Sequence, residues 1–131
     1  YPPLPDTVPE GAERAAAHED INLLTVLPAS DAPGLELLGT NGRWYPVPCD
    51  PGSIAVNGGE MLDLASGGYY PATTHRVVNP VGEAAKKARM SMPLFLQPAD
   101  DVVLAEGRTA GEFLRQRIIE LGSQGDADDD R

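Results

Sequence analysis

The fold of this chain is decided by one stretch, His18-Glu19-Asp20-Ile21-Asn22-Leu23-Leu24-Thr25-Val26-Leu27, which Pro28 brings to an end. Residues 21–27 are apolar and rich in strand-forming residues, so they predict a buried β-strand. His18 and Asp20 open this strand. Because residues i and i+2 of a strand point to the same face, both side chains can reach one metal ion while Glu19 faces away.

Short strands are also predicted further along the chain. The 13 Pro and 14 Gly indicate many turns, and Gly39-Thr40-Asn41-Gly42 supplies turn residues for a hairpin. Short strands at regular spacing favour a sandwich or a barrel, and therefore a mainly β fold. The predicted strands are residues 34–38, 43–47, 53–57, 69–78 and 88–97.

One segment, residues 110–121, has clear helical periodicity. Phe113, Leu114, Ile118 and Leu121 lie on one stripe of it, Thr109 is available as its N-cap, and Gly122 is the expected stop. Residues 122–131 are polar and strongly acidic, so we expect a disordered acidic tail.

Composition excludes some classes of partner. Ten Lys and Arg against 20 Asp and Glu give a formal net charge of -10, which repels phosphate backbones and anionic lipid surfaces. Nucleic acid and membrane are therefore not expected as partners. Cys49 is the only cysteine, and no apolar run has the length of a membrane span or a signal peptide, so a cytoplasmic location is expected.

The two histidines of the chain suggest a metal site. His75, in Thr74-His75-Arg76-Val77, would join His18 and Asp20 as the third ligand on one face of an octahedral metal site. Two imidazoles and one carboxylate on one face suit Fe(II), because the opposite face stays open for a co-substrate and dioxygen. Structural zinc prefers a closed tetrahedral set. Each histidine taken alone is more often a surface or satisfied core residue than a ligand.

Several motifs occur together and in order along the chain. They run from His18 to Leu27, and then continue through Pro33-Gly34-Leu35-Glu36-Leu37, Gly42-Arg43-Trp44, Pro51-Gly52-Ser53, Val56-Asn57-Gly58-Gly59-Glu60-Met61-Leu62, Thr74-His75-Arg76-Val77-Val78-Asn79-Pro80 and Arg89-Met90-Ser91-Met92-Pro93-Leu94-Phe95. In these motifs the chain resembles the 2-oxoglutarate- and Fe(II)-dependent oxygenases of the isopenicillin N synthase-like family.

The resemblance implies a double-stranded β-helix, or jelly roll, followed by a C-terminal helix. It implies that His18, Asp20 and His75 hold Fe(II), and that Arg89 and Ser91 bind the C5 carboxylate of 2-oxoglutarate. Tyr1 matches a family tyrosine whose hydroxyl contacts the same carboxylate. Asn57 corresponds to a family position close to the site, although an Asn that braces a turn explains it equally well.

Residue chemistry agrees with the assignment of Arg89 and Ser91. On a strand over residues 88–97 the two side chains share one face. A guanidinium can bind a carboxylate with two hydrogen bonds, and a hydroxyl two residues further on can add a third.

The implied function is a dioxygenase, an oxidoreductase that uses Fe(II), 2-oxoglutarate and O2 to oxidise a small organic substrate, with hydroxylation the commonest outcome and succinate and CO2 released. One alternative is an isopenicillin N synthase-like oxidase without 2-oxoglutarate, because that enzyme keeps the Arg-x-Ser pair for its substrate's carboxylate. Another is a non-catalytic metal-binding jelly-roll fragment. A zinc hydrolase is disfavoured because a third His, or a Cys near the ligands, is absent.

The chain begins with Tyr1-Pro2-Pro3 and is shorter than members of the family. We therefore expect it to be a segment of a larger protein whose N-terminal half packs on the barrel. Within the chain we expect the jelly-roll portion over residues 1–98, a C-terminal helical segment over 99–121 and the acidic tail over 122–131.

Overall fold

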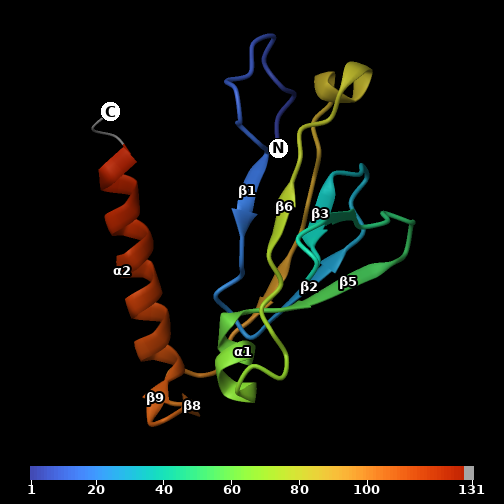
Figure 1. Cartoon of the computed structure of the whole chain (residues 1–131). Helices are drawn as coiled ribbons and strands as arrows, with labels where there is room; N and C mark the ends of the chain where they lie inside the picture. The colour runs from blue at the N-terminus through green and yellow to red at the C-terminus, as the bar shows by residue number, and fades with distance from the viewer. Residues whose placement is uncertain (129–131) are drawn as a thin grey trace.

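The chain folds into two small antiparallel sheets, a β-hairpin and two α-helices (Figure 1). The computed structural model describes the backbone of residues 1–128 and the side-chain surroundings of residues 1–122. The elements are β1 (Ala15–His18), β2 (Leu24–Pro28), β3 (Leu35–Leu38), β4 (Trp44–Pro46), β5 (Ile54–Gly58), α1 (Glu60–Ser66), β6 (His75–Val77), the 3-10 helix η1 (Gly82–Lys86), β7 (Leu94–Leu96), β8 (Val103–Ala105), β9 (Arg108–Thr109) and α2 (Ala110–Asp128).

The strands form two separate sheets. One has the order β1-β6-β3-β4, the other has the order β5-β2-β7, and β8 and β9 pair as a hairpin. Every pair is antiparallel. Residues of both sheets line one cavity, so the sheets face each other across it. The predicted mainly β fold with a C-terminal helix is confirmed, whereas within the described residues no strand pairing closes the sheets into a barrel.

The start of β2 differs from the prediction. His18 is the last residue of β1, Asp20 lies in the bend between β1 and β2, and β2 begins only at Leu24. The chain bends here because backbone N–H groups at the N-terminal end of α1 donate to the carbonyls of this segment. The Glu60 N–H, for example, donates to the Asp20 carbonyl at 2.8 Å. The same-face argument from a single strand is therefore wrong, although both side chains still point to one site.

Two further strands are shorter than predicted. Residues 69–74 lie outside β6. In this segment the Ala72 N–H donates to Asp63 Oδ2 and the Thr73 N–H donates to the Gly58 carbonyl, so these groups take no part in a strand ladder. Residues 88–93 lie outside β7. Arg89 instead exchanges both backbone hydrogen bonds with Tyr1, each at 2.9 Å. Pro93 has no N–H to contribute to a ladder.

The helix α1, which the periodicity analysis missed, anchors the main core. Met61 is almost fully buried and packs with Leu104, Ala110 and Phe113, so α1, β8 and the start of α2 share one apolar cluster. Figure 1 shows these three elements together at the base of α2. The cluster holds α1 in place under the bend that carries Asp20.

The helix α2 begins as predicted and ends later. The Glu112 N–H donates to Thr109 Oγ1 and the Thr109 N–H donates to Glu112 Oε2, a reciprocal capping box. The backbone hydrogen bond from Thr109 lowers the pKa of Glu112. The helix continues past Gly122 to Asp128, since one Gly costs an exposed helix only about 1 kcal/mol. Part of the expected disordered tail is thus helical, and residues 129–131 lie outside the described residues.

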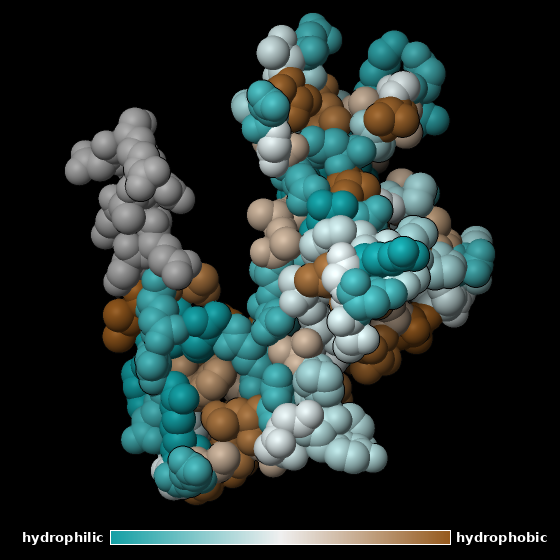
Figure 2. Space-filling model, in the orientation of Figure 1, coloured by the Kyte–Doolittle hydropathy of each residue, from teal (hydrophilic) through white to brown (hydrophobic). Residues whose placement is uncertain are grey.

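Beyond its first turns α2 exposes a few apolar side chains within a mostly hydrophilic surface (Figure 2). Phe113 is buried, but Ile118 and Leu121, on the same predicted stripe, are 57% and 50% exposed. An ion pair ties the helix to α1, with Arg117 Nε and Nη2 donating to the two Glu60 carboxylate oxygens at 2.6 and 2.7 Å. Glu60, and next Glu120, raise the pKa of Arg117.

No helix in the described part of the chain has the length and apolar character that a membrane span requires.

Candidate metal centre

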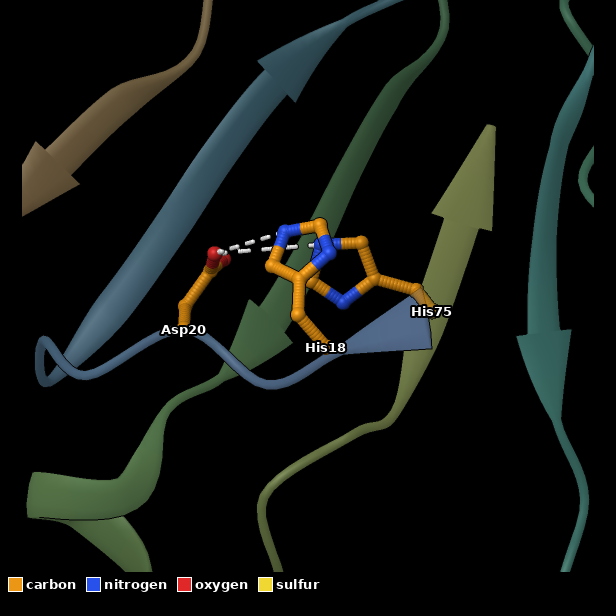
Figure 3. A group of neighbouring side chains, drawn as sticks. All are labelled: His18, Asp20 and His75. Atoms are coloured by element: carbon orange, nitrogen blue, oxygen red, sulfur yellow. Dashed lines mark ion pairs between the residues drawn. The ribbon is translucent and has the colours of Figure 1, made fainter. Parts of the chain in front are cut away.

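Three side chains from two segments of the chain converge on one point (Figure 3): His18 and Asp20 lie at and just after the end of β1, and His75 begins β6. His18 and His75 are cross-strand partners at the ends of β1 and β6, and their ring centroids lie 4.4 Å apart. Asp20 Oδ1 lies 3.8 Å from Nε2 of each histidine. One ligand atom from each of the three residues lies within 4.8 Å of the others, so one ion can contact all three.

Backbone carbonyls determine which nitrogen of each histidine is free. His18 Nδ1 lies 2.7 Å from the Ala16 carbonyl, and His75 Nδ1 lies 2.9 Å from the Thr73 carbonyl. A carbonyl oxygen only accepts hydrogen bonds, so each ring donates from Nδ1, and the neutral form of each ring has its lone pair on Nε2, where a metal ion can bind. Both Nε2 atoms face Asp20, the orientation that a metal ligand needs.

The carboxylate of Asp20 is held by two neutral donors. Thr25 Oγ1 donates to Asp20 Oδ2 at 2.5 Å, and Asn57 Nδ2 donates to the same oxygen at 3.0 Å. Oδ1 remains directed at the two histidines. The contact from Asn57 supports its reading as a residue close to the site, and Thr25 is a site residue that sequence reasoning missed. Its signal was a polar residue inside the apolar run of residues 21–27.

The triad opens into a cavity of about 220 Å³ between the two sheets. Tyr1 and Ser91 line this cavity together with His18, Asp20 and His75. Apolar side chains supply most of the remaining wall. They are Leu27, Leu35, Leu37, Val47, Val56, Val77 and Phe95.

Arg89 lies beside this cavity and not in its wall. It lines an adjoining hollow that shares Leu27, Leu35, Val47 and Ala55 with the cavity. Its side chain is buried, Nε donates to the Ala32 carbonyl at 3.1 Å, and Nη1 has no hydrogen-bond partner among the described residues. A buried cationic N–H without a partner is costly, and a carboxylate would satisfy it.

The donor set fits the groups that the sequence predicted. Two neutral imidazole nitrogens and one carboxylate oxygen on one side, with a cavity on the other, suit Fe(II) with open positions. The unpaired Arg89 Nη1 and the hydroxyls of Ser91 and Tyr1 suit the distal carboxylate of a small dicarboxylic acid. Trp44 takes no part, because its ring packs under the Arg76 guanidinium at 4.2 Å.

Relatives of known class match most of the chain. It is 33% identical to gibberellin 3-beta-dioxygenase 2 of Arabidopsis thaliana over 80% of its length, and 34% identical to flavonol synthase/flavanone 3-hydroxylase of Petunia hybrida over 77%. The chain spans only 28% and 27% of those two proteins.

Solved structures agree with these relatives. An oxygenase from Shewanella oneidensis superimposes with a TM-score of 0.82 at 52% identity, covering 93% of this chain and 45% of that one. Full-length Neurospora crassa T7H, solved in complex with alpha-KG, superimposes with a TM-score of 0.74 at 26% identity, covering 86% of this chain and 39% of that one.

The family model of the 2OG-Fe(II) oxygenase superfamily matches residues 1–98, which include the triad, Arg89, Ser91 and Tyr1. This match covers well over half of the chain, so the chain belongs to the 2OG-Fe(II) oxygenase superfamily.

Proposed function

We propose that this chain carries the catalytic centre of a non-haem Fe(II)- and 2-oxoglutarate-dependent dioxygenase. The observation that carries the proposal is the cluster of His18, Asp20 and His75, in which one ligand atom of each residue lies close to the others in the wall of a cavity. Family membership supports it. Because the chain spans less than half of the relatives it matches, the activity of the whole protein is part of the proposal.

The three clustered residues would hold the metal. The carbonyls of Ala16 and Thr73 fix the two imidazoles with Nε2 forward, so the histidines need no change of tautomer when the ion enters. Asp20 contributes the negative charge, which partly neutralises a divalent ion in a site with apolar walls.

Arg89, Ser91 and Tyr1 would bind 2-oxoglutarate at its distal carboxylate. The guanidinium has a buried N–H without a hydrogen-bond partner to offer. Ser91 and Tyr1 line the cavity that contains the triad, and the Tyr1 ring centroid lies 5.5 Å from the Arg89 guanidinium carbon. The aliphatic wall would exclude water from the co-substrate and so strengthen these charge-assisted hydrogen bonds.

When bound, Fe(II) and 2-oxoglutarate supply O2 activation coupled to oxidative decarboxylation, with succinate and CO2 as products and an oxidised substrate, most often a hydroxylated one. The relatives named above act, by their names, on gibberellin and on flavanone. A small organic molecule is therefore the substrate class that we propose for this protein.

We further propose that the two facing sheets belong to a double-stranded β-helix. The structural likeness to oxygenases supports this reading. Residues 1–98 would form the jelly-roll portion, followed by a C-terminal segment containing α2, and an N-terminal half like that of longer relatives would pack on the barrel. The cytoplasmic location remains a prediction.

The function is tested by incubating the protein with Fe(II), ascorbate, O2 and 2-oxoglutarate and measuring succinate. We expect release of succinate that depends on both iron and 2-oxoglutarate and rises with a suitable substrate. Oxygen uptake that needs no 2-oxoglutarate would favour an isopenicillin N synthase-like oxidase. Metal binding without either reaction would favour a non-catalytic module.

Replacing Arg89 by Lys is expected to weaken 2-oxoglutarate binding about 10- to 100-fold and to leave metal affinity nearly unchanged. An ammonium group cannot reproduce the forked contact, and a lost charge-assisted hydrogen bond costs about 1.5–3 kcal/mol. Calorimetric titration of the Mn(II)-loaded protein with 2-oxoglutarate measures the effect. Arg43→Lys, at an exposed position, is the matched control. Equal losses of metal and 2-oxoglutarate affinity would mean that Arg89 supports the fold instead.

A further inference from the structure

The geometry points to Thr25 and Asn57 as positioning residues that keep Asp20 a one-oxygen ligand and so keep a coordination position open on the metal. This inference rests on the proposed function, because it concerns the same centre. Both residues act on the metal only through Asp20.

The two donors are a cross-strand pair. Thr25 on β2 lies directly opposite Asn57 on β5, and the side chains of such a pair stand on the same face of the sheet. Both reach Asp20 Oδ2. The sheet register therefore determines where the carboxylate is held.

A third buried residue determines the direction of the Thr25 hydroxyl. Asn22 Nδ2 donates to Thr25 Oγ1 at 3.0 Å and also to the Leu24 carbonyl at 3.0 Å. With Oγ1 accepting from Asn22, its single proton is free for Asp20 Oδ2 at 2.5 Å, a much shorter contact than the 3.4 Å to Asn22 Oδ1. Thr25 and Asn22 are 3% and 2% exposed, so bulk water has little access to replace a hydrogen bond lost from the series that runs from Asn22 through Thr25 to Asp20.

These contacts leave only one oxygen of Asp20 for the ion. A carboxylate oxygen offers about two acceptor sites, and Oδ2 uses both, on Thr25 and Asn57. The backbone is held as well, because the Glu60 N–H donates to the Asp20 carbonyl. Oδ1 faces the two Nε2 atoms. Without the two donors, Oδ2 would turn toward the ion and occupy a position that co-substrate or dioxygen needs.

Two roles of the Thr25–Asn57 pair have different measurable consequences: support of the β2–β5 sheet, and the holding of Asp20 Oδ2. Loss of a cross-strand pair lowers the free energy of unfolding and leaves the number of water molecules on a bound ion unchanged. Loss of the two hydrogen bonds to Asp20 Oδ2 lowers the number of water molecules on the ion, because Oδ2 then binds the ion and displaces one of them. Counting waters on the ion therefore distinguishes the two roles.

The experiment loads Mn(II) into the purified protein and measures water-proton relaxation, which reports the waters bound directly to the ion. Thr25→Val and Asn57→Leu, singly and together, remove the donors at nearly constant shape. In the double variant we expect a loss of about one third of the inner-sphere relaxation, as when one of the open positions of a facial triad is filled. Thr25→Ser restores the hydroxyl, and Asn41→Leu, on the exposed β3–β4 turn, is the matched control. Both should match the wild type.

Each outcome is decisive. A folded double variant with the wild-type relaxation overturns the inference, as does a Thr25→Ser variant that behaves like Thr25→Val. If Thr25→Val does not fold, Asn57→Leu alone, at a partly exposed position, decides by the same measurement. Wild-type protein that binds no Mn(II) would instead defeat the proposed function itself.

Discussion

The His75→Ala variant is expected to bind Fe(II), or Mn(II) as a redox-inert substitute, more than about 100-fold more weakly than the wild type. Loss of a residue that hydrogen-bonds a metal ligand already lowers metal affinity about 10- to 100-fold, and this change removes one of the three proposed ligands. His18 and Asp20 would remain as an exchangeable two-ligand site. The chain has only two histidines, so no other imidazole can take the vacant place.

Isothermal calorimetry on the metal-free protein measures this loss. Thr74→Ala is a suitable control, because Thr74 precedes His75 and its hydroxyl contacts Glu19, outside the triad. The control should bind metal as the wild type does. Equal affinity in His75→Ala and the wild type would refute the ligand assignment, whereas loss of folding in His75→Ala would show as a lost unfolding transition in the metal-free protein.

The Gly59→Ala variant is expected to lose about 3 kcal/mol or more in free energy of unfolding, at the upper end of the cost of overpacking. A Cβ at this position would clash with the Asn22 carbonyl oxygen and would lie 2.6 Å from the Asp20 carbonyl oxygen. Both contacts are backbone atoms of the bend that carries Asp20, a proposed metal ligand, so relief requires α1 and the bend to separate. Metal affinity should fall together with stability.

Urea unfolding of the metal-free protein measures the free energy. Gly122→Ala is the control, since a Cβ there meets nothing within 4 Å and lies in α2. This control should gain about 0.5–1 kcal/mol, because Ala loses less backbone entropy than Gly in a helix. A Gly59→Ala protein as stable as the wild type would mean that the bend and α1 pack less closely than described.

Local patterns predicted the parts of the fold in which neighbours in sequence are also neighbours in space. The strand stopped by Pro28, the turn over residues 39–42 and the capped start of α2 at Thr109 are all present. The strands near Asp20 and Arg89 were predicted too long. Their backbone partners, Glu60 and Tyr1, lie far away in sequence, and no local pattern reports such a partner.

The candidate metal ligands could be predicted from composition and spacing alone, because two histidines and one suitably spaced aspartate left little choice. The sequence also determined the mainly β class through short apolar runs separated by Gly and Pro. The way in which the Asp20 carboxylate is held depends instead on a contact between segments that are distant in sequence. Asn57, 37 residues further along the chain, reaches the carboxylate because β5 pairs with β2 in one particular register. The position of Arg89, beside the triad cavity rather than in its wall, likewise could not be predicted from the sequence. The physical reason is the same in both cases: a side chain's direction follows from the pairing of distant backbone segments, and that pairing is stabilised by packing summed over the whole chain.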